Sequence, residues 1–160
     1  MRIGLLSDTH GLVRPEVLAW LRGSDHIVHA GDIVRPDILA QLAALAPLTA
    51  VRGNNDHGDW AERLPQAATL RLGGVCLHVV HDIAQLAIDP EAAGVQVVVS
   101  GHSHQPAVAR RGPVLYVNPG SAGPRRFRLP IAAGELLLDG GAVSAHIMRF
   151  EGATADKRRR

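Results

Sequence analysis

The segment Gly101-His102-Ser103-His104 places two imidazoles two residues apart beside a glycine. Four short polar clusters stand upstream of it, and each closes an apolar run: Asp8-Thr9-His10, Gly31-Asp32, Gly53-Asn54-Asn55-Asp56 and His81-Asp82. Together these segments supply seven nitrogen and oxygen ligands, which is enough for two metal ions. The candidate metal ligands are Asp8, His10, Asp32, Asn54, His81, His102 and His104.

The types of ligand indicate which ions and which reaction the site would support. Imidazole, carboxylate and amide oxygen without a thiolate suit Mn²⁺, Fe²⁺ or Zn²⁺. Two carboxylates against two divalent ions leave a charge of about +2, and a bridging hydroxide lowers it to about +1, so the site attracts phosphate. Two ions ~3.5–4 Å apart also orient an ester and lower the pKa of bound water. The pattern predicts hydrolytic phosphoryl transfer by a metal-bound hydroxide.

Each candidate ligand also has an ordinary structural explanation. Asp8 could cap a helix or a turn, Asp32 could belong to a plain turn, and Asn54 could tolerate a left-handed loop. A lone His81 would more often be structural than a ligand. Seven such groups at strand ends of one small domain are poorly explained by unrelated turns, so the joint pattern favours metal binding.

The elements that must position these residues follow from the apolar runs. Strands are expected over residues 2–7, 26–30 and 48–51, with helices that open at Pro15 and Pro36 between them. This β-α-β-α-β order implies a parallel sheet with crossover helices. Ligands of open α/β sheets bind beyond the carboxyl ends of the strands, so we expect the polar clusters to meet at one edge.

The second half of the chain is richer in short strands. Gly73-Gly74 predicts a hairpin of residues 67–72 and 75–80, and a helix is expected over residues 83–93. Further strands are expected at 95–100 and near 106–110, 113–117, 132–138 and 142–149. The fold class predicted is α/β: one domain over residues 1–152, with two sheets packed face to face and helices outside.

Composition narrows the class of protein. The 160 residues suit one domain with a sizeable core. No segment reaches the ~20 apolar residues of a membrane helix, so we expect no membrane contact. The strand-like run from Arg2 does not resemble the charged start, apolar stretch and cleavage site of a secretion leader, so we do not expect secretion. The single cysteine, Cys76, cannot form an internal disulfide, which fits a cytoplasmic protein.

The basic charge of the chain is concentrated at its end. There are 17 Lys and Arg against 15 Asp and Glu, and four of the basic residues form the run 157–160, so the remainder carries a net charge of −2. We expect residues 153–160 to be a disordered basic tail, with a weak nucleic-acid contact as the alternative. The acidic body and the aromatic content of 3% argue against binding of a long nucleic acid.

The clusters and their order along most of the chain resemble the calcineurin-like metallophosphoesterases. The compact length, the stretch Asn118-Pro119-Gly120-Ser121 and the following Pro124-Arg125 are similar to the small prokaryotic YfcE-like phosphodiesterase branch of that family. The resemblance implies a two-sheet αββα sandwich and a metal-dependent phosphodiesterase that acts on small or activated esters. Cyclic nucleotides are plausible substrates by the same resemblance.

The resemblance also implies the role of each ligand. Asp8, His10 and His104 should bind the first ion, and Asp32 should bridge both ions. Asn54, His81 and His102 should bind the second ion. The catalytic residues are expected to be Asp32, Asn54 and His102, with Mn²⁺ as the preferred ion and Fe²⁺, Zn²⁺, Ni²⁺ or Mg²⁺ as alternatives.

Two residues depart from the pattern of the wider superfamily. Asn55 stands where many members have a histidine that helps the leaving group, and asparagine cannot act as an acid near neutral pH. This favours esters with good leaving groups or strained cyclic phosphates, unless His57 compensates. Asp82 stands where the family often has glycine; it could crowd the site, form a hydrogen bond behind a ligand, or point away.

Four of the other histidines are expected to be structural. His78 should face away from His81 on its strand, and His29 is at best a partner behind the ligands. His26 and His146 look like ordinary strand residues. The Asn118–Ser121 turn is expected to be structural, with phosphate contact by Ser121 or Arg125 as the minor alternative.

Other functions remain open at this point. A phosphomonoesterase or a nuclease of the same superfamily is the alternative among enzymes. The retromer scaffold subunit resembles this fold and serves as a protein-interaction module with an incomplete metal set, whereas all seven ligand positions are filled here. The segment Arg125-Arg126-Phe127-Arg128 could be a solvated turn or an oligomer surface, so a homo-oligomer is possible.

Overall fold

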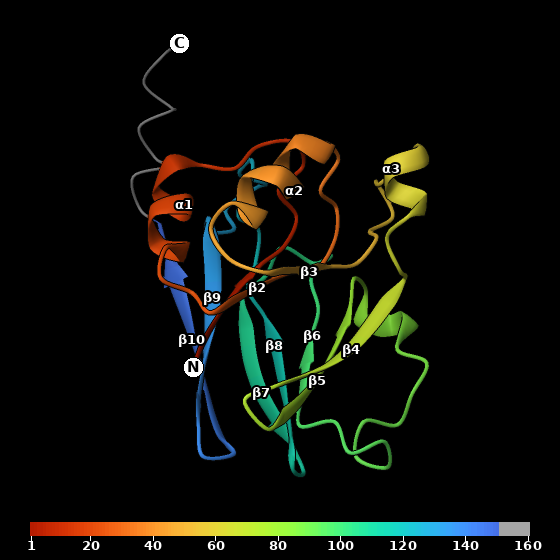
Figure 1. Ribbon diagram of the computed structural model, residues 1–160. Helices are drawn as coiled ribbons and strands as arrows, with labels where there is room; N and C mark the ends of the chain where they lie inside the picture. The colour runs from red at the N-terminus through yellow and green to blue at the C-terminus, as the bar shows by residue number, and fades with distance from the viewer. Residues whose placement is uncertain (151–160) are drawn as a thin grey trace.

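The computed structural model describes residues 1–150, and the first of its two five-stranded sheets is mixed (Figure 1). Its strand order is β10-β9-β1-β2-β3. The strands are β1 (Arg2–Leu6), β2 (His26–His29), β3 (Leu48–Ala50), β9 (Ala132–Asp139) and β10 (Ala142–Arg149). β1, β2 and β3 are parallel. β9 pairs with β1 and β10 pairs with β9, both in antiparallel fashion. The predicted parallel half is therefore confirmed.

The second sheet repeats this plan with a parallel centre and antiparallel edges. Its strand order is β4-β5-β6-β8-β7. The strands are β4 (Ala67–Leu72), β5 (Val75–Val80), β6 (Val97–Val99), β7 (Ala107–Arg111) and β8 (Val114–Asn118). β5, β6 and β8 are parallel, whereas β4 pairs with β5 and β7 pairs with β8 in antiparallel fashion. The predicted hairpin at Gly73-Gly74 joins β4 to β5.

Apolar side chains of both sheets fill the space between them. Ile3 and Leu5 of β1 lie in the same fully buried cluster as Leu77 and Val79 of β5. All six residues of β5 are buried, because one face contacts the first sheet and the other is covered from outside. The face-to-face sandwich expected from the sequence is confirmed.

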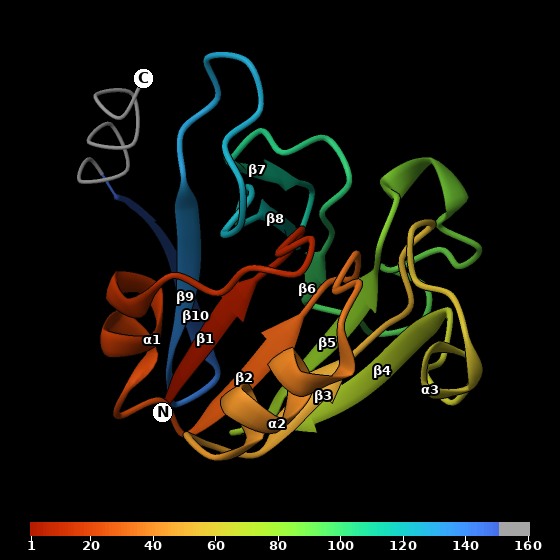
Figure 2. The ribbon, with the colours of Figure 1, turned by 90° about the horizontal axis from the view of Figure 1, so that it is seen from above.

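Two helices cover the outer face of the first sheet. α1 (Pro15–Leu21) and α2 (Pro36–Ala43) each begin with proline, whose fixed φ and missing N–H suit the first helical turn. Val17, Leu21, Ile38 and Leu42 point from these helices into a second buried cluster against the sheet. Figure 2 shows both helices on the same side of β1 and β2.

The prediction of a helix over residues 83–93 is wrong. The segment forms a single 3₁₀ turn, η1 (Ile83–Gln85), followed by hydrogen-bonded turns. Asp82 accepts a hydrogen bond from the Ala84 N–H at 3.0 Å, and Asp89, before Pro90, accepts one from the Ala92 N–H at 3.3 Å. These caps and the proline, which disfavours helical geometry at the residue before it, break one predicted helix into separate turns.

This irregular segment, rather than a helix, covers the outer face of the second sheet. Leu86 and Ile88 pack against Cys76 and Val98 there. Among the described residues, the expected outer helices therefore cover the first sheet but not the second. A further short helix, α3 (Asp59–Glu62), was not expected from the sequence. The boundary at residue 152 and the basic tail at 153–160 lie outside the described residues and stay predictions.

Candidate metal centre

The seven candidate ligands lie on loops that follow the carboxyl ends of five strands. β1 leads into Asp8 and His10, β2 into Asp32, and β3 toward Asn54. β5 leads into His81, and β6 leads toward His102 and His104. In Figure 2 the loops after β1 and β2 meet the loop after β5 at the same edge of the sandwich. Both sheets thus contribute ligands to one place.

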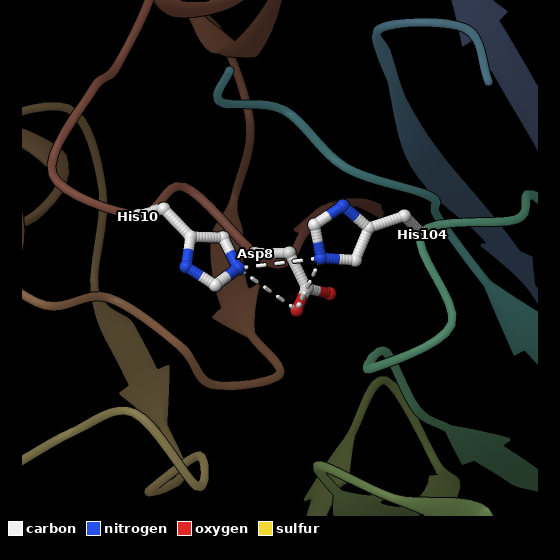
Figure 3. Close-up of side chains that lie close together, drawn as sticks. All are labelled: Asp8, His10 and His104. Carbon is white, nitrogen blue, oxygen red and sulfur yellow. Dashed lines mark hydrogen bonds and ion pairs between the residues drawn. The ribbon is translucent and has the colours of Figure 1, made fainter. Parts of the chain in front are cut away.

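Asp8, His10 and His104 form the first cluster, and Figure 3 shows the carboxylate between the two rings. Asp8 Oδ1 lies 3.6 Å from His10 Nε2 and 3.3 Å from His104 Nε2, and these two nitrogens are 3.2 Å apart. Asp8 Oδ1 is fully enclosed and has no hydrogen-bond partner among residues 1–150. An acceptor oxygen of this kind, beside two imidazole nitrogens, fits a cation between the three groups.

The other oxygen of Asp8 is already used. Asp8 Oδ2 accepts hydrogen bonds from the Ser7 hydroxyl at 2.7 Å and from the His102 N–H at 3.0 Å. Gly101 makes this approach possible, because a Cβ at its position would lie 2.7 Å from Asp8 Oδ2. The carboxylate is therefore held by one oxygen and presents the other to the first cluster.

Asn54, His81 and His102 form the second cluster. Asn54 Oδ1 lies 3.0 Å from His81 Nε2 and 3.2 Å from His102 Nδ1. His81 Nδ1 lies 2.7 Å from the Ala30 carbonyl, which can only accept, so a neutral ring that donates to this carbonyl carries its proton on Nδ1 and offers the Nε2 lone pair to an ion. Gly31 leaves room for this ring, because a Cβ there would lie 2.8 Å from His81 Nδ1. The tautomer therefore suits a ligand through Nε2.

Asp32 lies between the two clusters. Its Oδ2 is 3.6 Å from His10 Nε2 in the first cluster and 3.4 Å from His81 Nε2 in the second. The structure thus brings the seven predicted residues into two neighbouring sets of nitrogen and oxygen atoms with one carboxylate shared. Ion binding and the role of each residue stay predictions.

The electrostatics of the two carboxylates favour their charged forms. Burial alone would raise the pKa of Asp8, but the neighbouring His10 and His104 imidazoles hold that pKa well below its ordinary range. Burial also opposes ionisation of Asp32, whereas the neighbouring His81 imidazole and the hydrogen bonds from Asn55 lower its pKa to about 2. Burial opposes the charged form of His81, and the Asp32 carboxylate nevertheless raises its pKa. Both acids are ready to bind a cation.

Asp56 is a buried residue whose role was not predicted from the sequence. Its carboxylate accepts four main-chain hydrogen bonds, from Asp32 at 3.0 Å, Ile33 at 2.8 Å, Val34 at 2.7 Å and Gly53 at 2.8 Å. These donors belong to the loops that carry Asp32 and Asn54. The acid in the Gly53-Asn54-Asn55-Asp56 cluster was the available signal, but sequence spacing does not reveal backbone donors more than 20 residues away.

Asn55, the residue found where many superfamily members have histidine, contacts Asp32 twice. Its N–H donates to Asp32 Oδ1 at 2.9 Å and its side-chain amide donates to Oδ2 at 2.9 Å. The amide is therefore occupied with orienting the shared carboxylate. This contact also could not be read from the sequence, because asparagine in such a cluster is equally suited to a turn.

Four other histidines have partners outside the two clusters. His29 is fully buried between Thr9 Oγ1 and the Gly31 N–H, each at 3.0 Å, and burial lowers its pKa to about 3. The remaining three lie beside residues of neighbouring strands: His26 beside Thr49, His78 beside Thr69 and His146 beside Glu135. The structural roles expected for these histidines are thus supported by their contacts.

The turn at residues 118–121 braces the ligand loops. Asn118 donates from its side-chain amide to the Gly101 carbonyl and to Ser103 Oγ, both at 3.0 Å. The Ser121 hydroxyl is buried and donates to the Asp8 carbonyl at 2.9 Å. This is the structural role expected for the turn, and it leaves the Ser121 hydroxyl bound to the main chain.

A polar pocket of about 410 Å³ opens beside the second cluster. Asn54, His81 and His102 form one part of its wall. Other lining residues are Arg52, His57, Gln66, Asp82 and Gln85. Because only polar side chains and one glycine line it, the pocket suits a hydrogen-bonding ligand.

Comparison with known proteins shows the family. Residues 1–139 match the calcineurin-like phosphoesterase superfamily domain. The chain belongs to this superfamily. It is 34% identical over 161 aligned residues to a protein of Methanothermobacter thermautotrophicus named a probable metallophosphoesterase, with 93% of this chain and 92% of that protein covered. The resemblance and the assignment to metal-dependent phosphoesterases are confirmed.

Solved structures show the same fold at lower identity. One, described as a novel archaeal phosphodiesterase, has a TM-score of 0.74 and 20% identity, covering 92% of this chain and all of that one. Vps29 of Entamoeba histolytica in complex with Zn²⁺ has a TM-score of 0.74 and 18% identity, covering 93% and 99%. The sandwich of this metallophosphoesterase is therefore shared with an enzyme and with a vacuolar protein sorting protein.

None of the helices in residues 1–150 has the length and apolar character needed to cross a membrane.

Proposed function

We propose that this metallophosphoesterase is a dinuclear metal-dependent phosphodiesterase of small or activated phosphodiesters. The observation that carries the proposal is the pair of ligand sets on either side of Asp32 Oδ2, with Asp8 Oδ1 enclosed and without a hydrogen-bond partner among residues 1–150. We propose Mn²⁺ as the first choice of ion from the family resemblance, with Fe²⁺, Zn²⁺, Ni²⁺ or Mg²⁺ as alternatives that the mixed imidazole, carboxylate and amide ligands also suit.

Each ligand has a defined role in this proposal. Asp8, His10 and His104 hold one ion, and Asp32 is shared. Asn54, His81 and His102 hold the other ion. Two bound divalent ions would polarise a phosphoryl oxygen and lower the pKa of a water between them. Asn55 and Asp56 keep Asp32 and its loop in register, since their hydrogen bonds fix both the carboxylate and the main chain.

The substrate class follows from what surrounds the second cluster. Asn55 donates to Asp32 instead of offering an acid to the departing oxygen. Esters with good leaving groups and strained cyclic phosphodiesters are therefore favoured, because their leaving oxygen departs with little help from a proton. The adjoining polar pocket can take the alcohol portion of such an ester.

The scaffold alternative is distinguished by the ligands rather than by the fold. Vps29 shares the sandwich, and a shared fold leaves activity open. In this chain all seven ligand positions hold competent groups that lie in two compact sets. That arrangement supports an enzyme. We also propose a cytoplasmic location, because the one cysteine, Cys76, is buried and without a partner for an internal disulfide.

The proposal is tested with bis(p-nitrophenyl) phosphate and p-nitrophenyl phosphate, each with Mn²⁺, Fe²⁺, Zn²⁺, Ni²⁺ or Mg²⁺ added to metal-free protein. We expect the diester to be hydrolysed with a higher kcat/KM than the monoester, and Asp32→Ala to abolish turnover. Asp139→Asn, which changes an exposed acid at the end of β9, serves as the control. Absence of hydrolysis with every ion would sink the proposal, and faster hydrolysis of the monoester would assign a phosphomonoesterase instead.

A further inference from the structure

Asp82 contacts a ligand of the second cluster, although the proposed function does not use it. Its Oδ2 lies 3.8 Å from His102 Nε2, at the wall of the polar pocket. The Asp82 side chain is 26% exposed and the His102 side chain is 47% exposed, so the contact is partly shielded from water.

The orientation of the His102 ring determines what Asp82 can do. His102 Nδ1 faces Asn54 Oδ1 at 3.2 Å, so this nitrogen points into the second ligand set. A neutral imidazole carries one N–H, and a ring that gives its Nδ1 lone pair to a cation must carry the proton on Nε2. That N–H is the atom directed at the Asp82 carboxylate. A carboxylate behind a ligating histidine fixes the ring and makes it a stronger ligand.

Asp82 is itself held in place for this role. Its Oδ1 accepts the Ala84 N–H at 3.0 Å and caps the η1 turn. One oxygen is therefore engaged with the main chain while the other is directed at His102. The same peptide segment carries His81, so one short stretch supplies a ligand and supports a second ligand from another loop.

We propose that Asp82 is a positioning residue that orients His102 and strengthens its binding to the second metal ion. The inference rests on the second ligand set of the proposed function. It explains why a carboxylate is accommodated beside the site: its charge lies behind the imidazole instead of among the ligand atoms. The contact also involves the more exposed of the two rings in the second cluster, since the His102 side chain is 47% exposed and the His81 side chain 6%.

The test compares metal affinities rather than activity. Asp82→Asn keeps an oxygen that can cap Ala84 and removes the charge behind His102. Metal-free protein is titrated with Zn²⁺ in competition with a chelator, and the two binding steps are fitted separately. We expect the second ion to bind about 10–100-fold more weakly in Asp82→Asn, with the first ion unchanged. Asp139→Asn should leave both steps unchanged.

A double-mutant cycle separates positioning from simple charge attraction. In His102→Ala protein, adding Asp82→Asn should weaken the second ion by less than about twofold, because its partner is already absent. An equal loss in both backgrounds would show that the charge acts directly on the ion, and would overturn the proposal. Unfolding of the metal-free proteins is measured in parallel, and Asp82→Asn should match the wild type.

The outcomes also separate this inference from the proposed function. Wild-type protein that binds only one ion would contradict both. Wild-type protein that binds two ions, together with an unchanged second step in Asp82→Asn, would overturn the role of Asp82 alone.

Discussion

Replacing Asp56 with asparagine tests the view that one buried carboxylate fixes two of the ligand loops. Asp56 is fully buried, and its Oδ1 accepts from Ile33 and Val34 while its Oδ2 accepts from Asp32 and Gly53. Asparagine keeps one oxygen and places an NH₂ group at the other position. Two of the four main-chain N–H groups would then face a donor, and no water can replace the acceptor without rearrangement.

The magnitude follows from the number of bonds lost. A hydrogen bond to a charged group contributes roughly 1.5–3 kcal/mol, so losing two lowers the free energy of unfolding by about 3–6 kcal/mol. That is a large part of the roughly 5–15 kcal/mol that separates a folded domain from its unfolded chain. At roughly 2–4 °C per kcal/mol for a chain of this length, the midpoint should fall by at least about 6 °C.

The assay is chemical and thermal denaturation of Asp56→Asn in EDTA, so that the folding effect is measured without bound ions. Metal titration follows at a temperature where the variant is folded, and both ions should bind more weakly because Asp32 and Asn54 lie on the affected loops. Asp139→Asn should unfold within about 0.5 kcal/mol of the wild type, as exposed substitutions do. A comparable small change in Asp56→Asn would refute the reasoning.

Three further results are expected. Gly101→Ala should bind the first ion more weakly in a metal titration, because its Cβ would displace Ser7 Oγ and Asp8 Oδ2; unchanged affinity would contradict this close approach. The burial of His29 should by itself lower the free energy of unfolding of the metal-free protein by about 2–3 kcal/mol between pH 7.5 and 4.5, because unfolded His29 takes up a proton near pH 6.5 whereas the buried ring, with a pKa of about 3, does not. Denaturant midpoints of His29→Gln should therefore depend less on pH than those of the wild type. His104→Ala should weaken the first ion more than the second and His102→Ala the reverse, and equal losses in competition titrations would count against separate sites.

The location of the site could be predicted because the expected strand order and the polar residues that follow each strand indicate the same edge of the sheets. A parallel arrangement of β1, β2 and β3 forces the residues after each strand to one edge, and β5 and β6 do the same in the other sheet. The sequence therefore predicts which side chains lie together, but it does not predict the distances between their atoms. Which oxygen of Asp8 is already engaged depends on Ser7 and the His102 main chain, and this appears only in three dimensions.

What could not be predicted depends on partners that sequence spacing does not specify. The four donors to Asp56 are main-chain groups, three of them 22–24 residues away, and main-chain groups have no sequence signature. The wrong prediction of a helix over residues 83–93 has a different cause. Its apolar residues do face a sheet, as Leu86 and Ile88 show, but the local caps from Asp82 and Asp89 satisfy the backbone in turns instead of a helix.

The ligand loops hold an unusual backbone geometry, which indicates how the site is organised. Five of the seven candidate ligands have positive φ, a conformation that costs non-glycine residues of order 1–3 kcal/mol each: Asp8, His10, Asp32, His102 and His104. Bonds between loops offset that cost. The loop after β1 donates from Asp8 to the Gly31 carbonyl at 2.9 Å and from His10 to the Asp32 carbonyl at 3.0 Å.

The loops of the second sheet are tied in the same way. The Gly101 N–H donates to the His81 carbonyl at 2.9 Å, and the His102 N–H reaches across to Asp8 Oδ2 at 3.0 Å. Every loop that carries a strained ligand is therefore bonded to another ligand loop. These hydrogen bonds between the loops fix the directions of the ligand atoms, and ligands that are already oriented lower the ordering cost of binding an ion. Three further side chains support the ligands in the same way and are not ligands themselves. Asp56 binds the main chain of the ligand loops, Asn55 binds the Asp32 carboxylate, and Asp82 is proposed to orient His102.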